Sequence, residues 1–191
     1  MGRWQPDAKG RLAKAAMELY LEQGYDSTTV SEIAKRAGLT ERTFFRHFSD
    51  KREVLFGGAA ELEERLVDAV AAAPDSMGPI EAVTTALEAA AVLFQERREG
   101  VILRQKVINS NPELRERELI KLAALSAALA TALRRRGVGD PAADLSAEAG
   151  IAIFRISFDR WVAAGAKGDY RKLIRESVDQ LRAVTAGVRA P

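Results

Sequence analysis

Apolar residues early in the chain recur at the three- and four-residue spacing of amphipathic helices. One such run contains Val30, Ile33, Ala34 and Ala37. Thr29 directly precedes the run, and Glu32 follows Thr29 by three residues. A threonine and a glutamate at this spacing form a capping box, which satisfies two free backbone N–H groups where a helix starts. The pattern therefore predicts a helix that begins at or close to Thr29.

A second short helix is predicted directly after a tight turn. Gly38 stands where a chain leaving a helix often needs positive φ, which glycine adopts without a Cβ penalty. Thr40 then supplies the oxygen that caps the next helix. Two helices joined by a turn of about three to four residues form a helix-turn-helix.

The second helix has one face suited to a core and others suited to DNA. Phe44 and Phe48 are four residues apart and therefore share a face. Arginine pairs with guanine edges, while threonine and imidazole contact bases or phosphates. The residues predicted to contact DNA, with neighbouring hydroxyls included, are Thr29, Ser31, Thr40, Glu41, Arg42, Thr43, Phe45, Arg46, His47 and Lys51.

Two of these residues carry separate interpretations. Glu41 either accepts a hydrogen bond from cytosine N4 or favours the positive end of its own helix. Lys51 follows Ser49 and Asp50, and its ammonium is predicted to meet the DNA backbone, where it adds affinity without sequence choice.

The segment from Gly24 to Leu55 resembles the DNA-binding domain of TetR-type transcriptional regulators, the tetracycline-repressor family. The spacing of the whole pattern is more specific than any single residue. The shared features are a Thr-rich start, an Ile-Ala pair, Ala-Gly-Leu, a Thr-aromatic-aromatic-Arg-His-Phe core and a downstream lysine. In this chain they are Thr28 and Thr29, Ile33 and Ala34, Ala37 to Leu39, Thr43 to Phe48, and Lys51.

This chain departs from the family pattern at Phe45. The resemblance implies a tyrosine at the second aromatic position, with a hydroxyl that touches phosphate. Phe45 has no hydroxyl, so it is expected to keep the packing role and to lose that hydrogen bond.

The rest of the chain also shows helical spacing, and no strand alternation is found. The predicted fold is all-α, with an N-terminal three-helix helix-turn-helix domain over residues 1–56 and a larger helical domain over 57–191, about nine helices in total. Further helices are predicted over about 7–23, 51–70, 80–97, 101–109, 112–135, 145–164 and 170–186.

Composition narrows the function classes. The chain has no cysteine and a single histidine, His47, which argues against thiol chemistry, Ser-His-Asp catalysis and His-cluster metal sites. We therefore expect no enzyme activity, no metal and no cofactor. Residues 1–56 hold 10 Lys and Arg against 8 Asp and Glu, and the remainder holds 19 of each, so the whole excess of +2 lies at the predicted DNA-binding end.

The first residues of the chain bear on two predictions: where the protein resides in the cell, and whether an N-terminal arm contacts DNA. It lacks the apolar core of a signal peptide, and no uninterrupted apolar run approaches about 18 residues, so cytoplasmic residence without a membrane contact is expected. Arg3, Lys9 and Arg11 are taken to precede the first helix and to form either an arm that reaches phosphates or a minor groove, or a frayed, solvated tail.

Of the last two predicted helices, the one over 145–164 is apolar nearly all round and needs more than one covering surface, and the one over 170–186 has a single apolar face. They serve either as half of a four-helix dimer interface or as ordinary core of one protomer. The resemblance favours a homodimer, because TetR-type proteins pair through their last two long helices. The predicted interface residues are Ile151, Phe158, Leu173, Ile174, Val178 and Leu181.

The resemblance also implies a small-molecule effector, largely apolar, bound in the C-terminal domain. Apolar stripes are equally what helix packing requires, so the same side chains also fit an ordinary core. The candidate pocket residues are Phe94, Leu103, Arg104, Ile108, Leu114, Phe154, Phe158 and Trp161.

These patterns together predict a dimeric, ligand-responsive repressor of a pseudo-palindromic, double-stranded DNA operator. Two alternatives from other classes remain: an all-helical dimeric adaptor that uses its first domain for protein contact, and a helical enzyme. Salt-sensitive retention on DNA separates the regulator from the adaptor.

Overall fold

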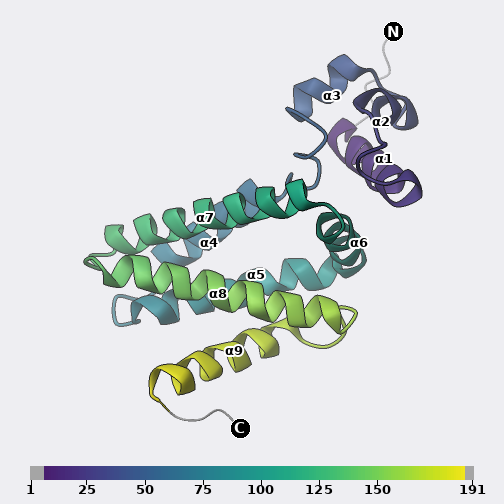
Figure 1. The fold of residues 1–191 in the computed structure, drawn as a ribbon. Coiled ribbons are helices and arrows are strands. Elements are labelled where there is room, and N and C mark those ends of the chain that lie inside the picture. Colours follow the sequence, from purple (N-terminus) through teal and green to yellow (C-terminus); the bar gives the residue numbers. More distant parts are fainter. Residues whose placement is uncertain (1–6, 188–191) are drawn as a thin grey trace. The chain divides into compact units, whose positions relative to one another are not determined.

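The computed structural model describes residues 7–187, and this part of the chain is helical, without strands (Figure 1). The predicted all-α class is confirmed. The helices within these residues are α1 (Ala8–Gln23), α2 (Val30–Arg36), α3 (Glu41–His47), α4 (Ala59–Ala71), α5 (Pro79–Glu96), α6 (Arg98–Asn109), α7 (Pro112–Arg135), α8 (Ala142–Ala163) and α9 (Tyr170–Thr185).

Most predicted helix bounds agree with the structure to within three residues, and α7 agrees at both ends. The prediction for α4 is wrong at its start, because this helix begins at Ala59 and not near Lys51. Residues 51–58 form successive turns that end in Gly57 and Gly58. Two adjacent glycines disfavour a continuous helix, since each loses more backbone freedom on folding than any other residue.

The chain divides into two compact units. The first contains the residues up to Ala59 together with Leu103–Glu118, and the second contains Ala60–Ile102 and the residues from Leu119 onwards. The predicted domain boundary stood after residue 56. The segment Leu103–Glu118, which includes most of α6 and the first turns of α7, was not expected in the first unit.

The first unit has its own apolar core. Helices α1, α2 and α3 contact one another, and the core between them contains Leu12, Ile33 and Phe44, all fully buried. Ile108 of α6 and Leu114 of α7 belong to the same core. This unit is therefore a bundle of three helices completed by the end of α6 and the start of α7, which lie much later in the sequence.

The second unit is built around α5, α8 and α9, which pack against one another. A cluster of aromatic rings connects these three helices. The centroids of Phe94 and Phe158 are 5.6 Å apart, and Trp161 stacks on Tyr170 at 5.0 Å. Aromatic pairs at such distances add to the stability that their buried area provides.

Helices α5 and α8 approach closely at Gly150, which is buried in the middle of α8. A Cβ atom added at Gly150 would overlap Cγ1 of Val83 on α5. The absence of a side chain therefore allows the two helices to reach their observed separation.

We expect Gly150→Ala to destabilise the second unit, because the new methyl group overpacks this crossing. Overpacking of a core costs about 1 to 3 kcal/mol, which outweighs the gain in helix propensity of up to about 1 kcal/mol. Chemical denaturation measures the loss. The double variant V83A/G150A removes the overlapping methyl groups and should recover part of it; equal stability of Gly150→Ala and the natural protein would contradict the argument.

Candidate nucleic-acid interface

The start of α2 forms the predicted capping box. The Glu32 amide donates to Thr29 Oγ1 at 3.2 Å, and the Thr29 amide donates to Glu32 Oε2 at 2.8 Å. The hydrogen bond from the Thr29 backbone contributes most to lowering the pKa of Glu32. The carboxylate is therefore held ionised at the positive end of the helix.

The turn between α2 and α3 also follows the prediction. Gly38 has φ of +65°, and the Leu39 amide donates to the Ala34 carbonyl at 2.8 Å. The Arg11 guanidinium donates to the Ala37 carbonyl and so secures the turn from α1. Thr40 caps α3 by accepting from the Thr43 amide at 3.2 Å.

Helix α3 buries one face and exposes the other. Phe44 is fully buried and Phe48 is 5% exposed, with ring centroids 5.5 Å apart. Phe45, in contrast, is 55% exposed. Arg42 and Arg46 are also exposed, so the two guanidinium groups and one aromatic ring share the outer side of the helix.

The edges of this outer face are less accessible than its centre. Thr43 is half-buried, and its hydroxyl lies 3.1 Å from the hydroxyl of Thr40. His47 is half-buried, and its Nε2 is covered without a hydrogen-bond partner in the protein. Among the predicted DNA-contacting residues, the exposed ones are Thr29, Ser31, Thr40, Glu41, Arg42, Phe45 and Arg46.

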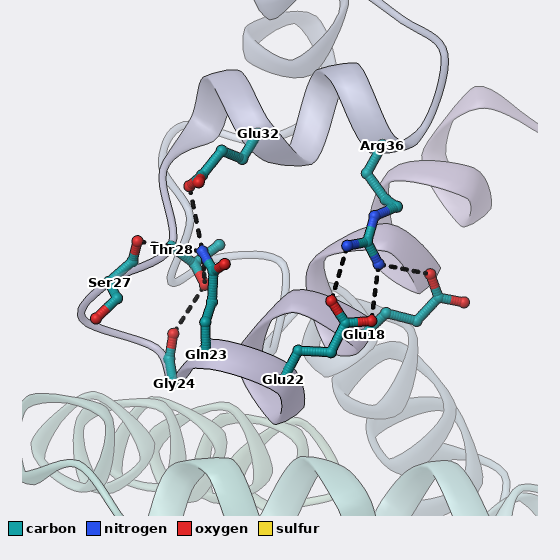
Figure 2. Close-up of polar contacts among 8 residues, drawn as sticks. All are labelled: Glu18, Glu22, Gln23, Gly24, Ser27, Thr28, Glu32 and Arg36. Carbon is teal, nitrogen blue, oxygen red and sulfur yellow. Dashed lines mark hydrogen bonds and ion pairs between the residues drawn. The ribbon is translucent and has the colours of Figure 1, made fainter.

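Polar side chains connect α1 to α2 (Figure 2). The Arg36 guanidinium makes a two-pronged contact with Glu22 at 2.9 and 2.7 Å and also reaches Glu18 at 3.6 Å. Gln23 Nε2 lies 3.3 Å from Glu32 Oε2. Exposed ion pairs contribute little stability, but a two-pronged arginine contact restricts the orientation of both groups.

Three basic residues do not lie where they were predicted. Lys51 Nζ donates to backbone carbonyls of the protein, the closest at 2.8 Å, where a contact with the DNA backbone was expected. Lys9 and Arg11 belong to α1 and not to an arm that precedes it. Arg3, the remaining arm residue, lies outside the described residues.

The predicted pocket residues do not form one cluster. Arg104, Ile108 and Leu114 belong to the first unit, as does Leu103. Ile108 and Leu114 are core residues there. The other four predicted pocket residues, all in the second unit, are Phe94, Phe154, Phe158 and Trp161.

Arg104 is a structural residue of the first unit. Its Nε donates to the Leu55 carbonyl at 2.6 Å, its Nη1 donates to Glu118 at 3.2 Å, and its guanidinium lies over the ring of Phe56. Burial lowers the pKa of Arg104, and Glu118 counteracts this shift. These contacts occupy the guanidinium group that was predicted to line the effector pocket.

The second unit offers two features that a ligand can use. The Trp161 side chain is fully buried, and its indole N–H has no acceptor within the protein. A surface hollow of about 480 Å³ lies at the end of α5 and the start of α6, lined by residues 95–100. Within the described residues, no group of His, Asp or Glu side chains is placed to hold a metal ion.

The predicted dimer residues all lie in the protomer's own core or pack against it. Ile151, Phe158 and Ile174 are buried within the second unit, so they are not available to a partner. Leu173, Val178 and Leu181 are partly buried against the same core. The large apolar residues that α8 and α9 expose are Leu145, Ile156 and Val184.

Sequence reasoning missed two contacts that join distant segments of the first unit. Asn111 Nδ2 donates to Asp26 Oδ1 at 2.9 Å, and Arg117 donates to Glu53 at 2.8 Å. The position of Asn111 before Pro112 predicts a helix N-terminus, but nothing in a single sequence identifies a partner 85 residues away.

None of the described helices is long and apolar enough to cross a membrane.

Two family models match the chain. Residues 12–56 match the model of bacterial regulatory proteins of the tetR family, and residues 77–186 match the model of the MftR C-terminal domain.

Individual relatives agree with these matches. The transcriptional regulator TcmR of Streptomyces glaucescens is 37% identical over 42% of this chain and 36% of its own length. The regulator MftR of Mycobacterium tuberculosis is 25% identical over 73% of this chain and 70% of its own length.

Solved structures extend the similarity of fold to nearly the whole chain. The transcriptional regulator FadR from Bacillus subtilis, solved in complex with stearoyl-CoA, has a TM-score of 0.63 at 21% identity and covers 94% of this chain and 99% of its own. The SmeT–triclosan complex has a TM-score of 0.66 at 18% identity and covers 92% of this chain and 90% of its own. The capped helix-turn-helix, its exposed arginine face and the two matching family models together assign this chain to the TetR family of bacterial transcriptional regulators.

Proposed function

We propose that this protein acts in the cytoplasm as a homodimeric repressor, which binds a pseudo-palindromic operator and releases it when a largely apolar effector binds. The observation that carries the proposal is the outer face of α3, where Arg42, Phe45 and Arg46 are exposed while Phe44 and Phe48 anchor the opposite side. A short helix with buried aromatic anchors and exposed arginines has the size and chemistry to enter a major groove.

Within this proposal the two arginines read bases. A guanidinium can donate two hydrogen bonds to O6 and N7 of one guanine, and a good pair of this kind discriminates against the wrong base by about 1 to 3 kcal/mol. Two-fold symmetry places the second α3 one or more turns of DNA away, with a spacing of about 34 to 36 Å per turn.

We expect Arg42→Ala and Arg46→Ala each to lower affinity for the preferred duplex by about fivefold to 100-fold, if each arginine makes one such base contact. The duplex is first selected by the natural protein from a random pool, and the affinities are then measured by fluorescence anisotropy. Arg115→Ala, which removes an exposed charge from α7 in the same unit, is the matched control. Unchanged affinity and base preference in both variants would contradict the proposal that α3 recognises bases through these arginines.

The dimer in this proposal uses the exposed apolar residues of the last two helices. Ile156 on α8 is 50% exposed and Val184 on α9 is 66% exposed. Exposed apolar side chains on two neighbouring helices are suited to a four-helix interface between identical protomers, because the same surface is used twice.

We expect Ile156→Glu to convert the dimer into a monomer, since burial of a carboxylate in an apolar interface is strongly unfavourable. Size-exclusion chromatography with light scattering gives the mass directly. Val92→Glu, at an exposed apolar position of α5, is the control and should remain dimeric. A dimer of undiminished affinity in Ile156→Glu would place the interface elsewhere.

The effector in this proposal is a largely apolar molecule. The FadR structure named above holds stearoyl-CoA, and the SmeT structure holds triclosan. In this chain the aromatic cluster of α5, α8 and α9 supplies apolar surface, and the unpaired Trp161 N–H supplies a hydrogen-bond donor for a ligand oxygen.

Acyl-CoA thioesters and chlorinated phenols are therefore the first probes. An effector must bind the released conformation more tightly than the DNA-bound one, so the same compound should raise the melting temperature and dissociate the selected duplex. Compounds that stabilise the protein without releasing DNA would be ligands but not effectors.

A further inference from the structure

The loop between α1 and α2 carries backbone groups that no helix satisfies. It runs from Gly24 to Thr29. Two contacts close it locally: the Thr28 amide donates to the Tyr25 carbonyl at 3.2 Å, and the Thr28 hydroxyl donates to the Gly24 carbonyl at 2.8 Å. Figure 2 shows the second contact beside Gln23, whose amide donates to the Ser27 carbonyl at 3.2 Å.

Lys51 holds this loop from one side. Its Nζ donates to the carbonyls of Tyr25 at 2.9 Å, Asp26 at 3.2 Å and Thr28 at 2.8 Å. A lysine ammonium has three N–H donors, so these contacts use all of them. The carbonyl of Lys51 itself accepts from the Tyr20 hydroxyl at 2.6 Å, which fixes the residue at both ends.

Asn111 holds the same loop from another side. Its Nδ2 donates to Asp26 Oδ1 at 2.9 Å. Its Oδ1 accepts from the amides of Glu113 at 3.0 Å and Leu114 at 3.3 Å, which are free donors in the first turn of α7. Asn111 is only 6% exposed, so one buried side chain links the N-terminus of α7 to the loop.

The loop leads directly into the reading helices. Thr29, its last residue, caps α2, and the Gly38 turn then connects α2 to α3. A change in the loop therefore changes the start of α2, and the rigid α2–α3 packing transfers that change to the outer face of α3.

We propose that Lys51 and Asn111 are positioning residues for operator recognition: they clamp the α1–α2 loop at Asp26 and so set the orientation in which α3 meets DNA. Lys51 contributes through the backbone of the loop and not through a phosphate contact. This inference rests on the proposed function, because it concerns how the reader is oriented on its operator.

The first test separates clamping from phosphate binding by Lys51. Lys51→Met keeps the length of the side chain and removes its donors, and Lys14→Met removes the same charge from an exposed position of α1. Affinities for the duplex selected by the natural protein and for poly(dI-dC) are measured over a range of salt concentrations, with folding checked by circular dichroism.

A clamping role predicts a loss of about tenfold or more on the selected duplex, a smaller loss on poly(dI-dC), and the same salt slope as Lys14→Met. A phosphate contact would instead weaken both duplexes alike and lower the slope by about 0.9. That second pattern, or affinity unchanged from Lys14→Met, overturns the proposal.

A second test keeps the proposal falsifiable if Lys51→Met does not fold. Asn111→Asp preserves the oxygen that caps α7 but places a carboxylate opposite Asp26. We expect a loss of about tenfold in affinity for the selected duplex, the size that corresponds to one partly buried hydrogen bond replaced by repulsion.

The double variant D26N/N111D exchanges donor and acceptor across the same contact and should restore the affinity. Rescue supports the clamp, because a general loss of stability would accumulate in the double variant. Absence of rescue, or full affinity in Asn111→Asp, overturns it. If the natural protein selects no sequence from the pool, the proposed function fails and this inference fails with it.

Discussion

The burial of Phe44 determines what the reading helix presents to its surroundings. A helix of seven residues has little stability of its own, so α3 depends on tertiary contacts to remain folded and to keep one rotation about its axis. Burial of one phenylalanine side chain contributes about 1.5 to 3 kcal/mol. Because Phe44 and Phe48 occupy the inner side, the arginines must occupy the outer side, and the proposed recognition of bases depends on that packing.

The first unit adds a second layer of constraint to this packing. Its core includes Ile108 and Leu114, and its polar contacts include Arg104 with the Leu55 carbonyl and Arg117 with Glu53. Four of these residues, Arg104, Ile108, Leu114 and Arg117, are far from the helix-turn-helix in sequence. The packing of the first unit therefore depends on residues of α6 and α7 as well as on the helix-turn-helix.

Local signals in the sequence were enough to predict the helices, the capping box at Thr29, the positive φ of Gly38 and the inward side of α3, since each depends on residues within a few positions. The contacts of Lys51 could not be predicted, because its acceptors are backbone carbonyls, which every residue type carries. The same limit applies to Ile151, whose apolar character fits a protomer core and a dimer interface equally well.

The inclusion of Leu103–Glu118 in the first unit has a consequence for the exchange of domains between related proteins. A chimaera cut after Ala59 would separate the helix-turn-helix from the apolar and polar partners that complete its unit, leaving Asp26 and Glu53 next to side chains selected by a different ancestor. Grafting of DNA specificity onto another sensor should therefore transfer two separate stretches of this chain, and the history of recombination in such proteins is expected to respect the same pairing.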